Sequence, residues 1–189
     1  MPFKVGDAGM QINEALRDLF SQSPKPLVIS IDGPAGSGKS TLAGEIARAF
    51  AGTYSIEVIH LDELYNGWDD ALSDELFRKL LGLINSQGAN ETADLEIFDW
   101  TLNSYAGSRQ VKPAELLIIE GVGSCNKLLR DKLSTSIWLD IDQSTGLARV
   151  LERDGNELQS EMVKWQKMER QYFARDLTRE NAEFILSTQ

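Results

Sequence analysis

The sequence is poor in cysteine and histidine, and it has no long apolar run. Its one cysteine, Cys125, excludes an internal disulfide framework, and its one histidine, His60, excludes a His-rich zinc site. Both counts fit a reducing cytoplasm. No apolar stretch approaches the roughly 20 residues of a membrane-spanning helix, and the first residues lack the continuous apolar region of a signal peptide. We therefore expect a cytoplasmic protein with no membrane partner.

Basic residues are also scarce relative to acidic ones. The chain has 19 Lys and Arg against 29 Asp and Glu, which gives a net charge of −10. A nucleic-acid-binding surface needs a basic face, so we expect no nucleic-acid partner. A length of 189 residues is enough for one compact domain with a substantial core, and we expect residues 1–189 to form a single domain. Composition leaves open whether the chain forms a homo-oligomer.

Glycine is concentrated in residues 33–40, which read Gly-Pro-Ala-Gly-Ser-Gly-Lys-Ser. Two glycines five apart, followed by Lys and Ser, match the phosphate-binding P-loop pattern. An apolar, β-branched run at 27–32 precedes the loop, and a helical pattern at 41–50 follows it, which is the context that this motif requires. Glycines let successive backbone N–H groups point at phosphate oxygens, and the helix N-terminus adds positive charge. The segment predicts binding of ATP or another nucleoside triphosphate.

Two side chains of this loop have predicted roles of their own. Lys39 is expected to neutralise the outer phosphates, and the Ser40 hydroxyl is expected to coordinate Mg²⁺. The complete set of predicted nucleotide-binding residues is Gly33, Ala35, Gly36, Ser37, Gly38, Lys39, Ser40 and Thr41.

Strand and helix patterns alternate along the rest of the chain. Strands are predicted at 27–32, 55–61, 115–121, 136–141 and 182–186, and helices at 41–50, 71–84, 144–153 and 158–177. We expect residues 1–23 to form an N-terminal helical extension, residues 85–93 a polar loop, and about 150–180 a lid and a long polar helix. This alternation predicts an α/β fold, a P-loop NTPase three-layer sandwich with an about five-stranded parallel sheet and helices on both faces.

Acidic residues follow two of the predicted strands, at the edge where parallel sheets bind ligands. Asp62 could take a proton from an attacking hydroxyl or hold a metal-bound water, or it could cap the next segment. Glu120 is expected to belong to the Mg²⁺ coordination shell, with a surface glutamate as the alternative. Tyr65 and Trp68 either line an acceptor pocket or cover the sheet edge.

The middle of the chain holds a further candidate for acceptor binding. Phe98 and Trp100 could stack on a planar base, with Asp99 accepting from a hydroxyl or amine. The alternative is a core β-hairpin. We interpret His60 and Cys125 as structural, and Trp165 as packing on the domain rather than on a ligand.

Two arginines are candidates for contacts with phosphate. Arg149 and Arg153 are four residues apart, so they share one face of the predicted helix, and the planar guanidinium bonds phosphate oxygens bidentately. Salt bridges to Glu152 or Asp154 are the alternative. We expect the polar stretch after Gly155 to close over the phosphates.

Taken together, these motifs resemble the uridine kinase/phosphoribulokinase branch of P-loop kinases, over residues 27 to about 155. In that family, an Asp-Asp-Phe-Tyr-like signature follows the second strand; its Asp is base and metal partner, and its Tyr helps hold the acceptor. The resemblance assigns these roles to Asp62 and Tyr65. It also matches Glu120-Gly121 after the third strand, and the lid pattern Arg-x-x-x-Arg-Asp at Arg149 to Asp154.

The resemblance implies transfer of the ATP γ-phosphoryl group to a hydroxyl of a uridine- or cytidine-like nucleoside. The basic triplet usual in the lid of uridine kinases is missing after Asp154, so a kinase for another small metabolite stays open. The P-loop also looks like that of cytidylate kinase, but residues 61–68 lack its Asp-Thr-Gly-x-x-Tyr-Arg-like segment. A GTPase is disfavoured because Leu129 stands where Asn-Lys-x-Asp needs its Asp. A regulatory ATP-binding protein remains an alternative.

Overall fold

A five-stranded parallel sheet forms the centre of the protein. The computed structural model describes residues 5–188 and places the strands in the order β2-β5-β1-β6-β7. Their bounds are β1 Leu27–Asp32, β2 Ile56–His60, β5 Leu116–Glu120, β6 Thr135–Asp140 and β7 Phe184–Ser187. Every residue of β1 and β5 is buried, which is why these central strands read as continuous apolar runs. The predicted parallel sheet is confirmed.

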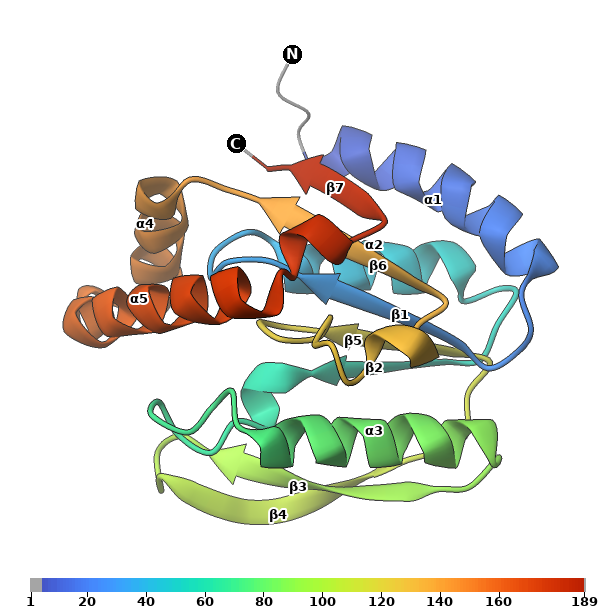
Figure 1. Cartoon of the computed structure of the whole chain (residues 1–189), viewed down its shortest axis with the longest axis horizontal. Coiled ribbons are helices and arrows are strands. Elements are labelled where there is room, and N and C mark those ends of the chain that lie inside the picture. The colour runs from blue at the N-terminus through green and yellow to red at the C-terminus, as the bar shows by residue number, and fades with distance from the viewer. Residues whose placement is uncertain (1–4, 189) are drawn as a thin grey trace.

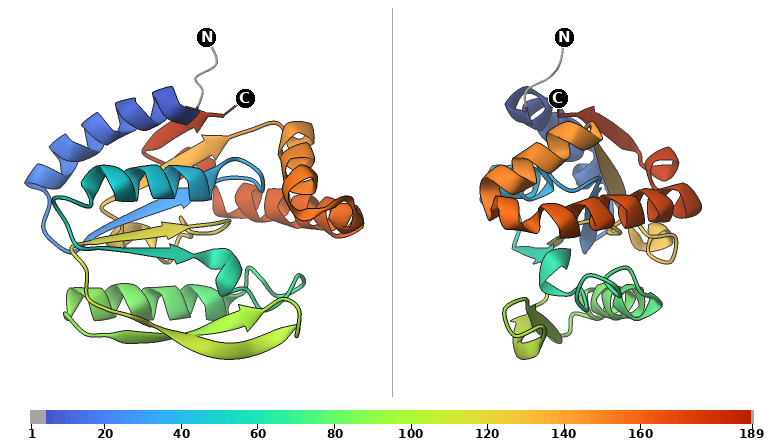
Figure 2. Two further views of the ribbon diagram at one scale, coloured as in Figure 1. Left: turned by 180° about the vertical axis from the view of Figure 1, so that it is seen from behind. Right: turned by 90° about the vertical axis from the view of Figure 1, so that its left-hand side faces the viewer.

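Helices cover both faces of this sheet. On one face, α1 (Val5–Gln22) and α2 (Lys39–Phe50) pack against alternate residues of β1, among them Leu27 and Ile29. The intervening residue Val28 points to the other face, where α3 (Asp74–Gly88) and α5 (Gln159–Asp176) contribute the second core cluster. Two opposite views in Figures 1 and 2 show the sheet between these groups of elements. The three-layer prediction is therefore confirmed.

The carboxyl ends of the strands all meet one edge of the molecule. The P-loop leaves β1 at this edge, and the short 3₁₀ helix η1 (Leu61–Glu63) follows β2 there. Figure 1 shows α4 (Gln143–Asp154) and α5 standing beside the strand arrowheads at the same edge. The topology thus collects segments that are far apart in the sequence around one place.

The segment between α3 and β5 differs from the sequence-based expectation. It forms an antiparallel hairpin of β3 (Ala93–Asp99) and β4 (Ser104–Val111), which was the alternative interpretation for Phe98 and Trp100 and for which no strand bounds were predicted. The predicted polar loop at 85–93 is wrong for most of its length, because α3 continues to Gly88 and β3 begins at Ala93. The buried Gln87 explains the longer helix, since its side chain bonds the backbone of Lys112 and Ala114.

The N-terminal helix α1 lies on α2. Its residues Ile12, Leu16 and Phe20 are buried in the core cluster of that face. Residues 1–4 of the predicted extension, and residue 189, lie outside the described residues. Over residues 5–188, no helix combines the length and apolar character needed to cross a membrane.

Candidate active site

The P-loop wraps the start of α2 in a tight turn of backbone. Gly36 and Gly38 have φ values of 78° and 90°, which glycine adopts without strain. A Cβ on Gly36 would lie 2.3 Å from the carbonyl oxygen of Gly146, so α4 and the loop approach each other backbone to backbone. Lys39 folds across the loop, and its Nζ donates to the carbonyls of Gly33 and Pro34 at 2.9 Å each. This ammonium is therefore held at the mouth of the loop.

Glu120 connects the P-loop to the ends of two strands. Its carboxylate is 3 % exposed, and its Oε1 accepts from the Ser40 hydroxyl at 2.9 Å. His60 Nδ1 lies 2.5 Å from the same oxygen, because His60 and Glu120 are register partners in β2 and β5. The contact with Glu120 raises the pKa of His60. His60, interpreted from sequence as structural, thus contacts a carboxylate that lines the cavity.

Asp62 lies on η1, two residues beyond the end of β2. It faces the cavity that Lys39, Ser40 and Glu120 also line. Burial raises the pKa of Asp62, and the negative charge of Glu120 raises it further. A carboxylate with a raised pKa beside a phosphate-binding loop is suited to accept a proton.

The cavity has a volume of about 560 Å³ and continues from the phosphate end to a cluster of aromatic rings. We call this cluster the aromatic wall; it consists of Tyr65, Trp68, Trp100 and Trp165. Trp68 touches Trp100 and Trp165, with ring centroids 5.0 and 5.9 Å apart, and Tyr65 lies 5.4 Å from Trp165. Trp100 Nε1 donates to the Asp62 carbonyl at 2.9 Å. Trp165 therefore packs on the domain as interpreted, and it also lines the cavity.

The structure brings only one residue of the predicted Phe98-Asp99-Trp100 group to the cavity. The Asp99 carboxylate instead closes the hairpin turn by accepting from the amides of Thr101 and Leu102. Phe98 is buried in the hairpin and meets Tyr105 edge to face at 5.4 Å. The hairpin interpretation applies to these two residues, and Trp100 is the one that lines the cavity.

The two arginines of α4 have different positions. Arg153 lines the cavity and pairs with Asp154, with N···O distances of 2.6 Å for both hydrogen bonds. Arg149 donates to the carbonyl of Gly36 at 3.4 Å and to that of Thr188 at 2.7 Å. Arg149 thus ties the P-loop to the chain end beyond β7 rather than facing the cavity.

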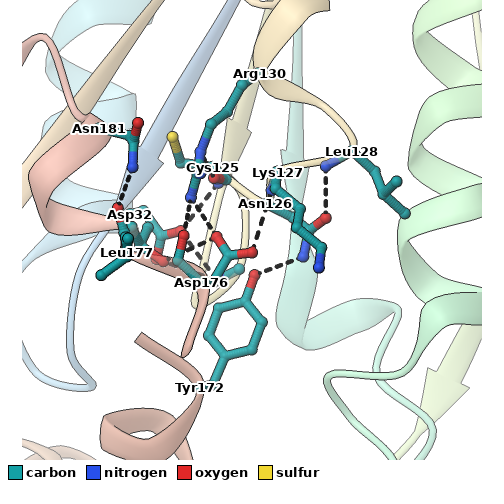
Figure 3. A network of polar contacts seen from close by, with 12 residues as sticks. Asp32, Cys125, Asn126, Lys127, Leu128, Arg130, Tyr172, Asp176, Leu177 and Asn181 are labelled. Carbon is teal, nitrogen blue, oxygen red and sulfur yellow. Dashed lines mark hydrogen bonds and ion pairs between the residues drawn. The ribbon is translucent and has the colours of Figure 1, made fainter. Parts of the chain in front are cut away.

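Two buried carboxylates that the sequence patterns did not indicate accept hydrogen bonds from backbone amides of the P-loop. Asp32, 1 % exposed at the end of β1, accepts from the amides of Gly33, Gly123 and Cys125. Its burial raises its pKa to about 6. Figure 3 shows Asp32 beside the loop that follows β5. Glu169, 2 % exposed on α5, accepts from the Ala35 amide at 3.1 Å, and burial raises its pKa.

The donor set at the phosphate end suits a hard divalent cation. A hydroxyl from Ser40 and carboxylates from Glu120 and Asp62 face the same cavity. Among residues 5–188, no three His, Cys, Asp or Glu side chains gather as a self-sufficient metal site.

Comparison with known proteins agrees with this geometry. The family described as "AAA domain" matches residues 29–173. A uridine kinase of Clostridium tetani is 30% identical over 151 residues, which cover 71% of each chain.

Solved structures share the fold. A "possible uridine kinase" from Bacillus stearothermophilus superposes with a TM-score of 0.65 at 19% identity, covering 91% of this chain and 99% of that one. D-glycerate 3-kinase from Cryptococcus neoformans var. grubii gives a TM-score of 0.64 at 14% identity and covers 96% of both chains. The chain therefore belongs to the uridine kinase-like family of P-loop kinases.

Proposed function

We propose that this protein transfers the γ-phosphoryl group of ATP, with Mg²⁺, to a hydroxyl of a uridine- or cytidine-like nucleoside. The observation that carries the proposal is one continuous cavity, with the P-loop and Asp62 at one end and the aromatic wall at the other. A nucleoside has the matching parts, a hydroxyl to be phosphorylated and a planar base.

The phosphate end supplies the positive charge that phosphoryl transfer requires. Lys39 would neutralise the outer phosphates, and the amides of the P-loop would bind their oxygens. Ser40, Glu120 and Asp62 would hold Mg²⁺ directly or through water. When bound, the cation neutralises charge that develops on the transferring group.

Asp62 is the proposed general base. The acceptor hydroxyl would lie between this carboxylate and the γ-phosphorus; the new O–P bond forms as the bond to the ADP oxygen breaks. The hydroxyl proton moves to the Asp62 carboxylate. A raised pKa improves Asp62 as an acceptor of that proton.

The aromatic wall supports a planar, uncharged acceptor. The four rings contact one another at interplanar angles of 46°, 58° and 76°. Trp100, which is 38 % exposed, is the most accessible of them, and a base stacked on such a ring gains about 1–3 kcal/mol. Within the described part of the chain, the cations that line the cavity are Lys39 and Arg153, and Arg153 is already paired with Asp154. An acceptor with its own carboxylate or phosphate would therefore lack a free cation beyond those at the phosphate end.

The test is acceptor-dependent ADP release with a defined panel of compounds. Uridine and cytidine represent the proposed class of acceptor. Fructose represents neutral sugars, glycerate represents carboxylates, and uridine monophosphate represents nucleotides, which already carry a charged phosphate. We expect the nucleosides to give a kcat/KM at least about tenfold above each of the others, a factor equal to ~1.4 kcal/mol of transition-state binding. Preference for glycerate or fructose would contradict the nucleoside assignment.

A further inference from the structure

The buried carboxylate of Glu169 reaches the phosphate-binding loop from a helix that otherwise faces the acceptor. Its Oε2 accepts from the Ala35 amide at 3.1 Å, and its side chain is almost fully buried. A carboxylate beside an anion-binding loop repels phosphate, so an unpaired one would weaken nucleotide binding. Burial raises the pKa of Glu169, while the positive charge of Lys39 and the hydrogen bond from the Ala35 amide oppose that rise.

Two kinds of backbone amide can be distinguished in the P-loop: one that is bonded to Glu169, and others that have no acceptor in the described protein. Glu169 occupies the amide of Ala35. Over residues 5–188, no protein group accepts a hydrogen bond from the amides of Gly36 and Gly38, which leaves them for phosphate oxygens. Ala35 thus serves as a fixed point of the loop, next to the amides that remain available.

Glu169 belongs to a row of residues along one face of α5. Trp165 and Met162, about one and two turns earlier, line the acceptor end of the cavity. Tyr172 and Asp176, further along the same face, contact the loop after β5: the Asn126 amide donates to the Tyr172 hydroxyl at 2.9 Å, and Arg130 donates to Asp176. Figure 3 shows these two anchoring contacts at the end of α5. The helix is therefore fixed at one end and contacts both substrate regions.

We propose that Glu169 is a positioning residue for phosphoryl transfer, which locks the P-loop to the helix that carries Trp165 of the aromatic wall. The inference rests on the proposed function, because it assigns the acceptor to that wall. Through this bond, α5 sets the position of the nucleotide phosphates relative to the acceptor hydroxyl. Small errors in such alignment are costly, since a misplacement of about 1 Å can reduce the rate about 10²-fold.

The variants Glu169→Ala and Glu169→Gln separate positioning from packing. Glutamine keeps a carbonyl oxygen that can accept from the Ala35 amide, whereas alanine leaves the amide without a partner. Gln166→Ala is the matched control: Gln166 is buried on the same helix, and its side chain bonds Gln143 of α4 rather than the P-loop.

The first measurement is hydrogen exchange at the Ala35 amide of the full chain, followed by NMR without any acceptor. We expect Glu169→Ala to speed this exchange at least about tenfold, the effect of losing about 1.4 kcal/mol of local protection. Glu169→Gln and Gln166→Ala should stay within about threefold of wild type. Unchanged exchange in Glu169→Ala would overturn the proposal.

The second measurement separates kcat from the KM for ATP in the acceptor reaction. Glu169→Ala should lower kcat about 10- to 100-fold with the KM for ATP within about threefold, and Glu169→Gln should restore most of kcat. Equal kcat losses in Glu169→Ala and Gln166→Ala, or a higher KM for ATP with unchanged kcat, would overturn the positioning role. If wild type phosphorylates no acceptor of the panel, the proposed function has failed. The exchange at Ala35 still decides whether Glu169 holds the loop.

Discussion

The hydroxyl of Ser40 and the carboxylate of Glu120 lie 2.9 Å apart, although 80 residues separate them in the sequence. The sheet order explains this contact, because β1, which leads into the P-loop, pairs directly with β5, which ends at Glu120. The contact brings the nucleotide loop to the strand end that carries the buried acid. The proposed magnesium site depends on that neighbourhood.

Lys39→Ala should remove nearly all phosphoryl transfer while leaving the fold intact. The Lys39 ammonium donates to two backbone carbonyls of its own loop and is not part of the apolar core, so its loss should have little effect on packing. Electrostatic stabilisation of the transferring group is commonly the largest catalytic contribution, and one lost donor costs about 10²–10³ in kcat. Steady-state kinetics and thermal unfolding would be measured together, with the exposed Lys112→Ala as control. Near-normal turnover in Lys39→Ala would place the site elsewhere.

Asp62→Asn should preserve nucleotide binding and lower kcat by about 10²–10⁴, the usual contribution of a positioned base. In the wild-type protein, the dependence of kcat on pH should show the titration of this base. Because burial raises the pKa of Asp62, kcat should fall as the pH drops through a value above the ~3.9 of an ordinary aspartate.

Asp62→Asn should abolish this acidic limb of the profile. An equal loss of ATP affinity and of rate would instead show that Asp62 only organises the metal.

Trp100→Ala should weaken acceptor binding and leave nucleotide binding unchanged. Trp100 contributes one ring of the aromatic wall, and losing a stacking ring costs about 1–3 kcal/mol, or roughly 5- to 150-fold in the KM of the acceptor. Leu102→Ala is the control, since Leu102 is exposed on the same hairpin turn and does not line the cavity. If both variants bind the acceptor as wild type does, the wall is not the acceptor site.

The two arginines of α4 should give different phenotypes. Arg153→Lys keeps the charge but loses the planar fork, so kcat should fall at least about tenfold with little change in ATP affinity. Arg149→Ala should act through the P-loop backbone, lowering ATP affinity and the unfolding temperature instead, because Arg149 bonds the carbonyls of Gly36 and Thr188. Arg78→Lys, on the exposed side of α3, is the control. Identical effects of the two α4 variants would contradict the separate roles.

Much of the architecture could be predicted because its strongest elements have simple patterns. The central strands β1 and β5 are buried on both faces, so they read as continuous apolar runs ending in an acid or a glycine loop. The hairpin was only an alternative without strand bounds, because β4, Ser104–Val111, is mostly polar and exposed and has a single partner strand. Its β-forming tendency comes from the β3 partner, which periodicity does not reveal.

Residues of the site could likewise be predicted where the sequence pattern places them at a strand end, and not where their role depends on a tertiary contact. Asp62 and Glu120 could be predicted because the carboxyl ends of parallel strands converge. Glu169 could not, since its role depends on α5 approaching the P-loop, a tertiary contact with no sequence spacing of its own. His60 had one available signal: it ends the strand that pairs with the strand ending at Glu120, but this pairing is known only from the register.

Transfer of label from γ-³²P-ATP tests the central claim most directly. The full chain would be incubated with labelled ATP, Mg²⁺ and uridine or cytidine, and the label would be followed into the nucleoside product and into inorganic phosphate. The proposed arrangement of P-loop, Asp62 and aromatic wall predicts label in the nucleoside at least about 100-fold faster than in phosphate, with this advantage lost in Asp62→Asn. Label that appears only in inorganic phosphate with every acceptor of the panel would contradict the proposed kinase activity and favour a regulatory ATP-binding protein.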